Sequence, residues 1–184
     1  MDRLGNGLVV TLAFLALVLG ASLVEPASAQ DKPRAGGELL FLVPSEPPSY
    51  DAHRESTFGV IHPLAPHYST LLRIDPFDRT GTKVAGDLAE SWAISKDGRT
   101  YTFKLRQGVK FHDGSALTSR DVKATYDKII SPPAGVVSMR KSAYVGVEAV
   151  EAPDAQTVRF RLKWPESSFL LNLASPFNYV YKAD

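Results

Sequence analysis

The stretch that decides the fold runs from Asp87 to Val122 and reads DLAESWAISKDGRTYTFKLRQGVKFHDGSALTSRDV. Residues 89–94 suit a strand, residues 95–98 (SKDG) a tight turn, and residues 99–105 alternate between apolar and polar side chains. An Asp-Gly pair supplies the positive φ that a hairpin turn needs. Strict alternation is typical of a strand with one buried face. The segment therefore predicts an antiparallel hairpin.

The second half of this stretch predicts a turn followed by a helix. His112 to Gly114 (HDG) has the composition of another tight turn. Thr118 is a good N-cap, and the apolar residues after it recur at helical spacing. The helix should continue to about Ile130, because the prolines at 132–133 cannot extend it.

Further elements are predicted on both sides. Residues 38–43 (ELLFLV) form a continuous apolar run between two glycines and Pro44, which suits a buried strand. The other predicted elements are a helical face over 58–72, a hairpin of residues 143–151 and 157–162, a short helix over 167–173 and a strand over 177–181. This mixture of strands and helices predicts an α/β fold.

The N-terminus has the pattern of a secretory signal peptide. Residues 8–19 are almost wholly apolar, and Ala27-Ser28-Ala29 is a small-x-small site followed by polar residues. We expect cleavage after Ala29, so that residues 1–29 are removed. The alternative is an uncleaved anchor, although the apolar run up to Val24 is just shorter than the ~18 residues of a clear membrane span.

The composition excludes several classes of protein. The chain has 21 Lys and Arg against 20 Asp and Glu, a balance that does not indicate binding to nucleic acid or to an anionic membrane surface. It has no cysteine, which excludes both disulfides and a lipid-modified cysteine at the cleavage site. We therefore expect a monomer that is free in the periplasm and is not a lipoprotein.

The stretch of residues 87–122 also resembles the signature of the extracellular solute-binding proteins of family 5, the peptide- and nickel-type binding proteins of ABC importers. The matching elements are Leu88–Trp92, Asp97-Gly98, Tyr101–Phe103, Leu105-Arg106, Val109–Gly114 and Asp121-Val122. Ser119 stands where the family usually has Ala. Weaker likeness extends from Gly36 to about Pro176.

The resemblance implies a periplasmic-binding-protein type II fold that closes on its ligand. Members of the family are much longer, and this sequence stops directly after an apolar segment. We expect residues 30–184 to be the truncated N-terminal part of the solute-binding domain. This part would hold the first strand of the main lobe and the family's extra α/β subdomain, with most of the pocket beyond residue 184.

The implied function is capture of a small solute for an ABC permease. An oligopeptide is the first expectation for the solute, and nickel or a metal chelate is the second. Two alternatives from other classes are a secreted enzyme and a sensory or adaptor module on the same fold. No nucleophile–base set, paired carboxylates or phosphate loop is present in the sequence, so we expect no catalytic residue.

The histidines do not predict a metal site. His53, His62 and His67 are spaced by nine and five residues, which matches no standard ligand pattern. His112-Asp113 lies in a predicted tight turn. We expect neither a metal nor a cofactor.

Three loops are candidates for contact with the solute, because ligands of α/β folds bind at strand ends and between domains. They follow the first predicted strand, follow the long helix, and cross back near residue 177. By resemblance, the first and third border the cleft and the second can reach it. Arg140 is suited to pair with a ligand carboxylate. The candidate ligand-binding residues are Tyr50, Asp51, His53, Met139, Arg140, Phe177 and Asn178.

Overall fold

The computed structural model describes residues 35–38, 40–43 and 45–183, so the predicted signal peptide lies outside the described residues. The chain divides after Leu40 into two units, and every helix and strand reported below belongs to the second unit, Phe41–Asp184. No helix in the described part of the chain is long and apolar enough to cross a membrane.

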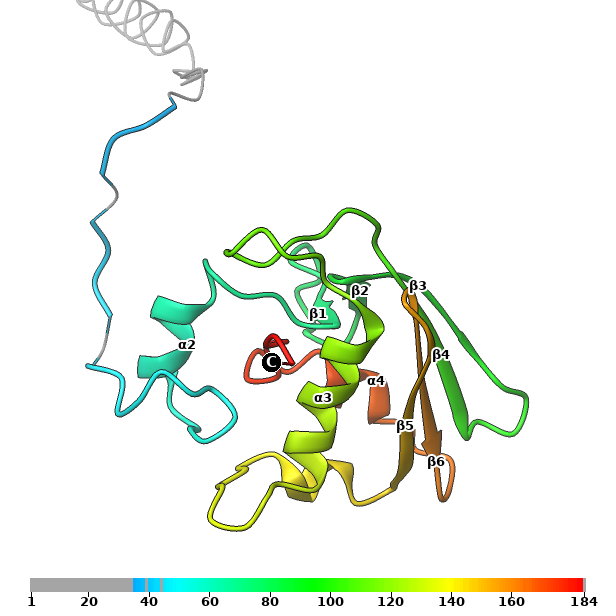
Figure 1. Cartoon of the computed structure of the whole chain (residues 1–184). Coiled ribbons are helices and arrows are strands. Elements are labelled where there is room, and N and C mark those ends of the chain that lie inside the picture. Colours follow the sequence, from blue (N-terminus) through cyan, green and yellow to red (C-terminus); the bar gives the residue numbers. More distant parts are fainter. Residues whose placement is uncertain (1–34, 39, 44, 184) are drawn as a thin grey trace, which may run out of the picture. The chain divides into compact units, whose positions relative to one another are not determined.

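A four-stranded antiparallel sheet forms one layer of the fold (Figure 1). Its order is β3 (Ala89–Ile94), β4 (Thr100–Leu105), β6 (Thr157–Leu162) and β5 (Val147–Asp154). Both predicted hairpins are confirmed. In the first hairpin Gly98 has a φ of 67° and its N–H donates to the Ser95 carbonyl, as the Asp-Gly turn predicts.

One face of this sheet carries the main core. Tyr101, Phe103 and Leu105 point to this face from β4 and are buried, as the alternation predicts. Phe103 and Phe160 meet edge to face with ring centroids 5.8 Å apart. The opposite face is charged, with ion pairs such as Arg159–Glu151 at 3.2 Å.

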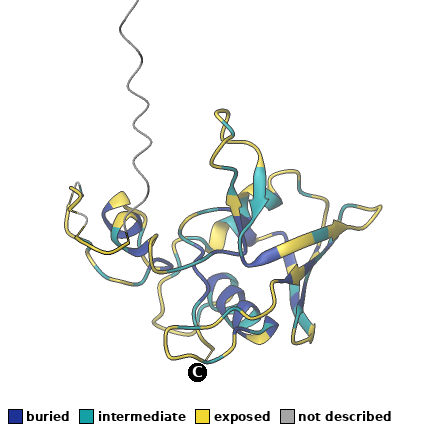
Figure 2. Cartoon of the chain, turned by 90° about the horizontal axis from the view of Figure 1, so that it is seen from above, coloured by how far each residue is buried: buried dark blue, intermediate teal, exposed yellow. Residues whose placement is uncertain are grey.

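Two helices cover the core face of the sheet. The helix α3 (Ser119–Ile130) places Tyr126 against Phe160, with ring centroids 4.9 Å apart. The short helix α4 (Phe169–Leu173) places Phe169 5.5 Å from the same Phe160 ring. Figure 2 colours the chain by burial, and the residues of α3 are buried or intermediate except for the exposed Arg120. Helix and sheet therefore form the two layers of an α/β unit, as predicted.

The start of α3 is fixed by a capping box. Thr118 and Asp121 exchange hydrogen bonds between side chain and backbone, which confirms the predicted N-cap. Ser119, the departure from the family pattern, is fully buried and its hydroxyl donates to the Asp154 carbonyl.

Other elements connect these layers. A two-stranded antiparallel sheet pairs β1 (Leu72–Ile74) with β2 (Val84–Gly86), and a 3-10 helix η1 (Lys141–Tyr144) precedes β5. The helix predicted over 58–72 is shorter than expected. It is α2 (Phe58–Leu64), and Leu72 belongs to β1 because the chain turns after the second proline.

Two predicted strands are wrong. The described residues of 38–43 form no strand, and the side chains of Leu40 and Leu42 are 87% and 98% exposed. Residues 177–181 are not assigned to a strand either. Their backbone bonds run to a loop and a side chain instead, from the Val180 N–H to Ser69 and from the Tyr181 N–H to Thr125. An apolar run becomes a strand only where a neighbouring strand accepts its hydrogen bonds.

Candidate functional site

The first candidate loop, residues 49–55, is organised by Asp51. Its Oδ1 accepts the His53 N–H at 3.0 Å, and its carbonyl accepts the Arg54 N–H at 3.1 Å. The Ser49 hydroxyl donates to Glu55 at 2.7 Å and closes the loop. An aspartate that accepts a backbone N–H two residues later makes a compact turn without regular secondary structure.

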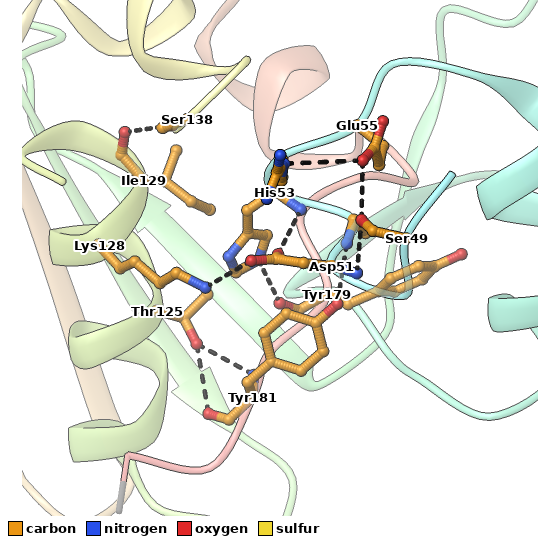
Figure 3. Close-up of polar contacts among 12 residues, drawn as sticks. Ser49, Asp51, His53, Glu55, Thr125, Lys128, Ile129, Ser138, Tyr179 and Tyr181 are labelled. Atoms are coloured by element: carbon orange, nitrogen blue, oxygen red, sulfur yellow. Dashed lines mark hydrogen bonds and ion pairs between the residues drawn. The ribbon is translucent and has the colours of Figure 1, made fainter. Parts of the chain in front are cut away.

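His53 joins this loop to the other two candidate loops (Figure 3). Its side chain is 1% exposed, and its Nε2 lies 2.9 Å from the Tyr179 carbonyl oxygen. Because a carbonyl only accepts, Nε2 carries the proton in the neutral ring. The His53 carbonyl accepts the Met139 N–H at 2.9 Å. Residues near 53, 139 and 179 therefore lie together although they are far apart in the sequence.

A charged pair flanks the histidine. Lys128, on α3, donates to Asp51 Oδ2 at 3.0 Å. Partial burial opposes ionisation of Asp51, but the bond and charge of Lys128 outweigh it and lower the pKa of this carboxyl. Burial is the main reason that the pKa of His53 is lowered, and the charge of Lys128 adds to the effect.

Arg140 and Phe177 bring the second and third loops into contact. The guanidinium carbon lies 4.0 Å from the centroid of the Phe177 ring, within the range of a cation–π interaction. The Arg140 Nε is buried and has no hydrogen-bond partner in the described part of the chain. Burial lowers the pKa of Arg140, although an arginine remains charged at any ordinary pH.

Asn178 holds the third loop in place from the interior of the protein. It is fully buried, and its Nδ2 donates to the Tyr144 hydroxyl at 2.7 Å and to the Asn172 carbonyl at 2.8 Å. Its Oδ1 has no partner among the residues that the structure describes. Asn178 is thus an internal support, and its neighbour Phe177 is the residue that meets Arg140.

The structure brings six of the seven predicted residues into this network and leaves one outside. Tyr50 is 70% exposed, and no hydrogen bond or ring contact joins its side chain to the other loops among the residues that the structure describes. Met139 is linked through its backbone, and its side chain is 48% exposed.

Sequence reasoning missed Lys128, Thr125 and Tyr181. Thr125 and Lys128 lie three residues apart on one face of α3, a spacing that brings side chains together. Helical spacing could have paired these two residues, but nothing in the sequence places that face against the loop of residues 49–55.

Two hollows on the surface border this network, one of them lined by Tyr181 and the other by Tyr179. One of about 350 Å³ has an apolar floor that includes Phe111 and Val180, with His112 at its side, and another of about 450 Å³ includes Arg73. Tyr68 lies in the walls of both. Neither is lined by a predicted ligand residue. No three His, Asp or Glu side chains in the described ranges are arranged to hold a metal ion.

The described α/β unit thus brings three loops together around charged and aromatic side chains. The model of the bacterial extracellular solute-binding proteins, family 5 (middle), matches residues 83–184. The chain belongs to this family, and its fold is part of the periplasmic-binding-protein fold.

Three similar proteins illustrate the range of the family. Di/tripeptide-binding protein 1 of Pseudomonas aeruginosa is 31% identical over 192 aligned positions, which cover 96% of this chain and 34% of the relative. Glutathione-binding protein GsiB of Pectobacterium atrosepticum is 44% identical over 94 positions, 51% of this chain and 18% of the relative. The structure of NikA from Brucella suis in complex with Fe(III)-EDTA is 30% identical with a TM-score of 0.61, covering 74% of this chain and 26% of that one.

This chain therefore spans about a third of the length of the di/tripeptide-binding relative.

Proposed function

We propose that this chain is the N-terminal portion of the periplasmic substrate-binding component of an ABC importer, and that the whole protein captures a small peptide-like solute for transport. Its work is binding followed by delivery to the membrane permease, and it catalyses no reaction. The named relatives support this proposal, because they bind di- and tripeptides and glutathione. A metal chelate is the second candidate solute, supported by the NikA complex.

The convergence of three distant loops is the observation that carries the proposal. Arg140 is its functional centre, because the Phe177 ring lies against the guanidinium and the Arg140 Nε has no partner in the described part of the chain. Peptides, glutathione and EDTA all carry carboxylates, and a carboxylate matches this fork of donors.

The remaining predicted residues have different parts in this proposal. The exposed side chains of Tyr50 and Met139 offer apolar contact to the solute. Asp51 is suited to an amino group of a peptide, in competition with Lys128. His53 and Asn178 act from the interior by holding the loops in place.

The test is a binding measurement on the protein encoded by the complete reading frame that contains this sequence. Calorimetric titration with di- and tripeptides, glutathione and a nickel chelate identifies the solute. Arg140→Met should then weaken binding by about ten- to a hundredfold, the value of one charge-assisted hydrogen bond. Arg140→Lys should restore only part of it, because an ammonium lacks the planar fork.

The matched control is Arg161→Met, which removes an exposed arginine paired with Glu148 and Glu151 on the charged face of the sheet. It should leave the dissociation constant unchanged. Equal losses in the two variants would contradict the role of Arg140, and turnover of any of these solutes would favour the alternative of a secreted enzyme.

Export and processing form a separate part of the proposal. A protein cleaved after Ala29 begins at Gln30 and is free in the periplasm, which N-terminal sequencing of the periplasmic fraction can establish. A protein that retains Met1 in the membrane fraction would contradict this and support an uncleaved anchor.

A further inference from the structure

We propose that His53 is a pH-sensitive latch: the neutral ring holds the loop of residues 49–55 against the returning segment of residues 177–181, and protonation releases it. The latch is a property of the described part of the chain and does not depend on which solute the protein binds.

Only one of the two ring nitrogens of His53 makes a hydrogen bond within the described part of the chain. Its Nε2–H donates to the Tyr179 carbonyl at 2.9 Å, and the tilted Tyr181 ring lies 4.7 Å away, centroid to centroid. The Nδ1 atom is buried and has no partner in the residues that the structure describes. A bare Nδ1 lone pair is tolerable in a neutral ring, whereas an added N–H would need an acceptor.

The charged and titratable groups around His53 do not supply that acceptor. Asp51 is the nearest carboxylate, but one of its oxygens accepts the His53 backbone N–H and the other is paired with Lys128. Glu55 is held by Ser49, with Arg54 4.0 Å away. The segments that contact His53 carry three further titratable groups. They are the Arg140 guanidinium, next to Met139, and the hydroxyls of Tyr179 and Tyr181.

Protonation therefore introduces a buried positive charge beside Lys128 and a donor without an acceptor. The Nε2–H bond to Tyr179 survives protonation in principle, but the charged ring gains more by moving into water. That movement breaks the bond to Tyr179 and disturbs the bond from the Met139 N–H to the His53 carbonyl. The first candidate loop separates from the second and third as a result.

The direction of the pH dependence follows from linkage. Burial lowers the pKa of His53 below its ordinary value of 6.5, so the open loop binds a proton more readily than the closed loop. The closed form is at full stability above about pH 6.5 and loses stability as the pH falls towards the pKa of the closed form. In that window its population relative to the open form falls by up to about tenfold per pH unit.

Two NMR measurements on the protein encoded by the complete reading frame test the latch without any ligand. A pH titration of the imidazole nitrogens should show His53 as the Nε2–H tautomer, still mostly neutral at about pH 6.5, where an ordinary histidine is half protonated. Amide hydrogen exchange should show that the protection factor of the Met139 N–H decreases as the pH is lowered below about 6.5.

Variants separate a latch from general acid sensitivity. His53→Gln can still donate to the Tyr179 carbonyl but cannot titrate, so Met139 protection should no longer depend on pH in this range. His67→Gln, on an exposed side chain, should leave the pH dependence intact. Lys128→Met removes the neighbouring charge and frees Asp51, so it should raise the pKa of His53.

The proposal is overturned if His53 in the unmodified protein is half protonated at about pH 6.5 or above, or if Met139 protection is constant from about pH 7.5 to 5. The proposal would also be overturned if Met139 protection in His53→Gln decreased with falling pH as steeply as it does in the unmodified protein. Because both readouts are available for the unmodified chain, a variant that fails to fold does not leave the question open.

Discussion

At the scale of single residues, Trp92 and Phe103 show how burial depends on the position of a strand in the sheet. They face each other across β3 and β4, with ring centroids 6.4 Å apart. Alternation predicts that both are buried. Phe103 is fully buried, whereas Trp92 is only partly buried, because β3 is an edge strand with a neighbour on one side only.

This difference predicts unequal costs of truncation. Phe103→Ala should lower the free energy of unfolding by about 3–5 kcal/mol, because it opens a cavity in the core. Trp92→Ala should cost less, about 1–2 kcal/mol, because part of the indole already contacts water. Urea unfolding of the two variants compares these costs directly, and an equal or larger loss for Trp92→Ala would contradict the account of the sheet edge.

A second prediction concerns the support beneath the third loop. The Tyr144 hydroxyl donates to the Asn172 carbonyl at 2.9 Å and accepts from Asn178. Tyr144→Phe should reduce the free energy of unfolding by about 1–3 kcal/mol, since it leaves buried groups with fewer partners. Tyr50→Phe, on an exposed side chain, is the control and should be neutral in the same denaturant titration. A neutral Tyr144→Phe would show that the hydroxyl is not needed there.

At the scale of elements, the capping box of α3 is the clearest local determinant. Thr118 precedes the helix, and its hydroxyl donates to Asp121 at 2.8 Å. Thr118→Ala should cost about 1 kcal/mol of unfolding free energy, whereas Thr118→Ser keeps the hydroxyl and should stay within a few tenths of the original value. If serine is as harmful as alanine, the methyl group matters rather than the cap.

The elements that the sequence predicts correctly are those with local causes. The hairpin at Gly98 and the start of α3 at Thr118 depend on residues within a few positions of each other. The segments at residues 38–43 and 177–181 are apolar, which indicates burial or pairing somewhere but does not name a partner. Strand pairing is non-local, so these two predictions lacked the information that decides them.

The candidate site divides in the same way. A general rule about where ligands bind selects three loops that lie together in the structure, where Met139 and His53 are in direct backbone contact. The rule does not reveal which residues of α3 face these loops, so Lys128 was missed. Nor does it distinguish a surface residue such as Tyr50 from an internal support such as Asn178.

At the scale of the whole molecule, exposed apolar residues near the start of the described chain predict self-association of residues 30–184 expressed alone. Leu42 is 98% exposed and Phe41 55% exposed, in a segment with unpaired backbone groups. Light scattering should show aggregates that Leu42→Lys reduces. Phe77→Lys, which replaces a singly exposed ring, is the control and should have little effect. A monodisperse protein in solution would contradict this prediction.

The central claim is that the loops around His53, Arg140 and Phe177 together face the solute. Hydrogen–deuterium exchange is the measurement that tests this claim. It is carried out on the protein from the complete reading frame, with and without the peptide that binds most tightly. Residues 49–55, 136–140 and 176–181 should all take up less deuterium when peptide is bound, while exchange in the hairpin turn at 95–98 should not change. Protection confined to other segments, such as the hollow around residues 109–113, would contradict it, as would the absence of binding by any of the candidate solutes.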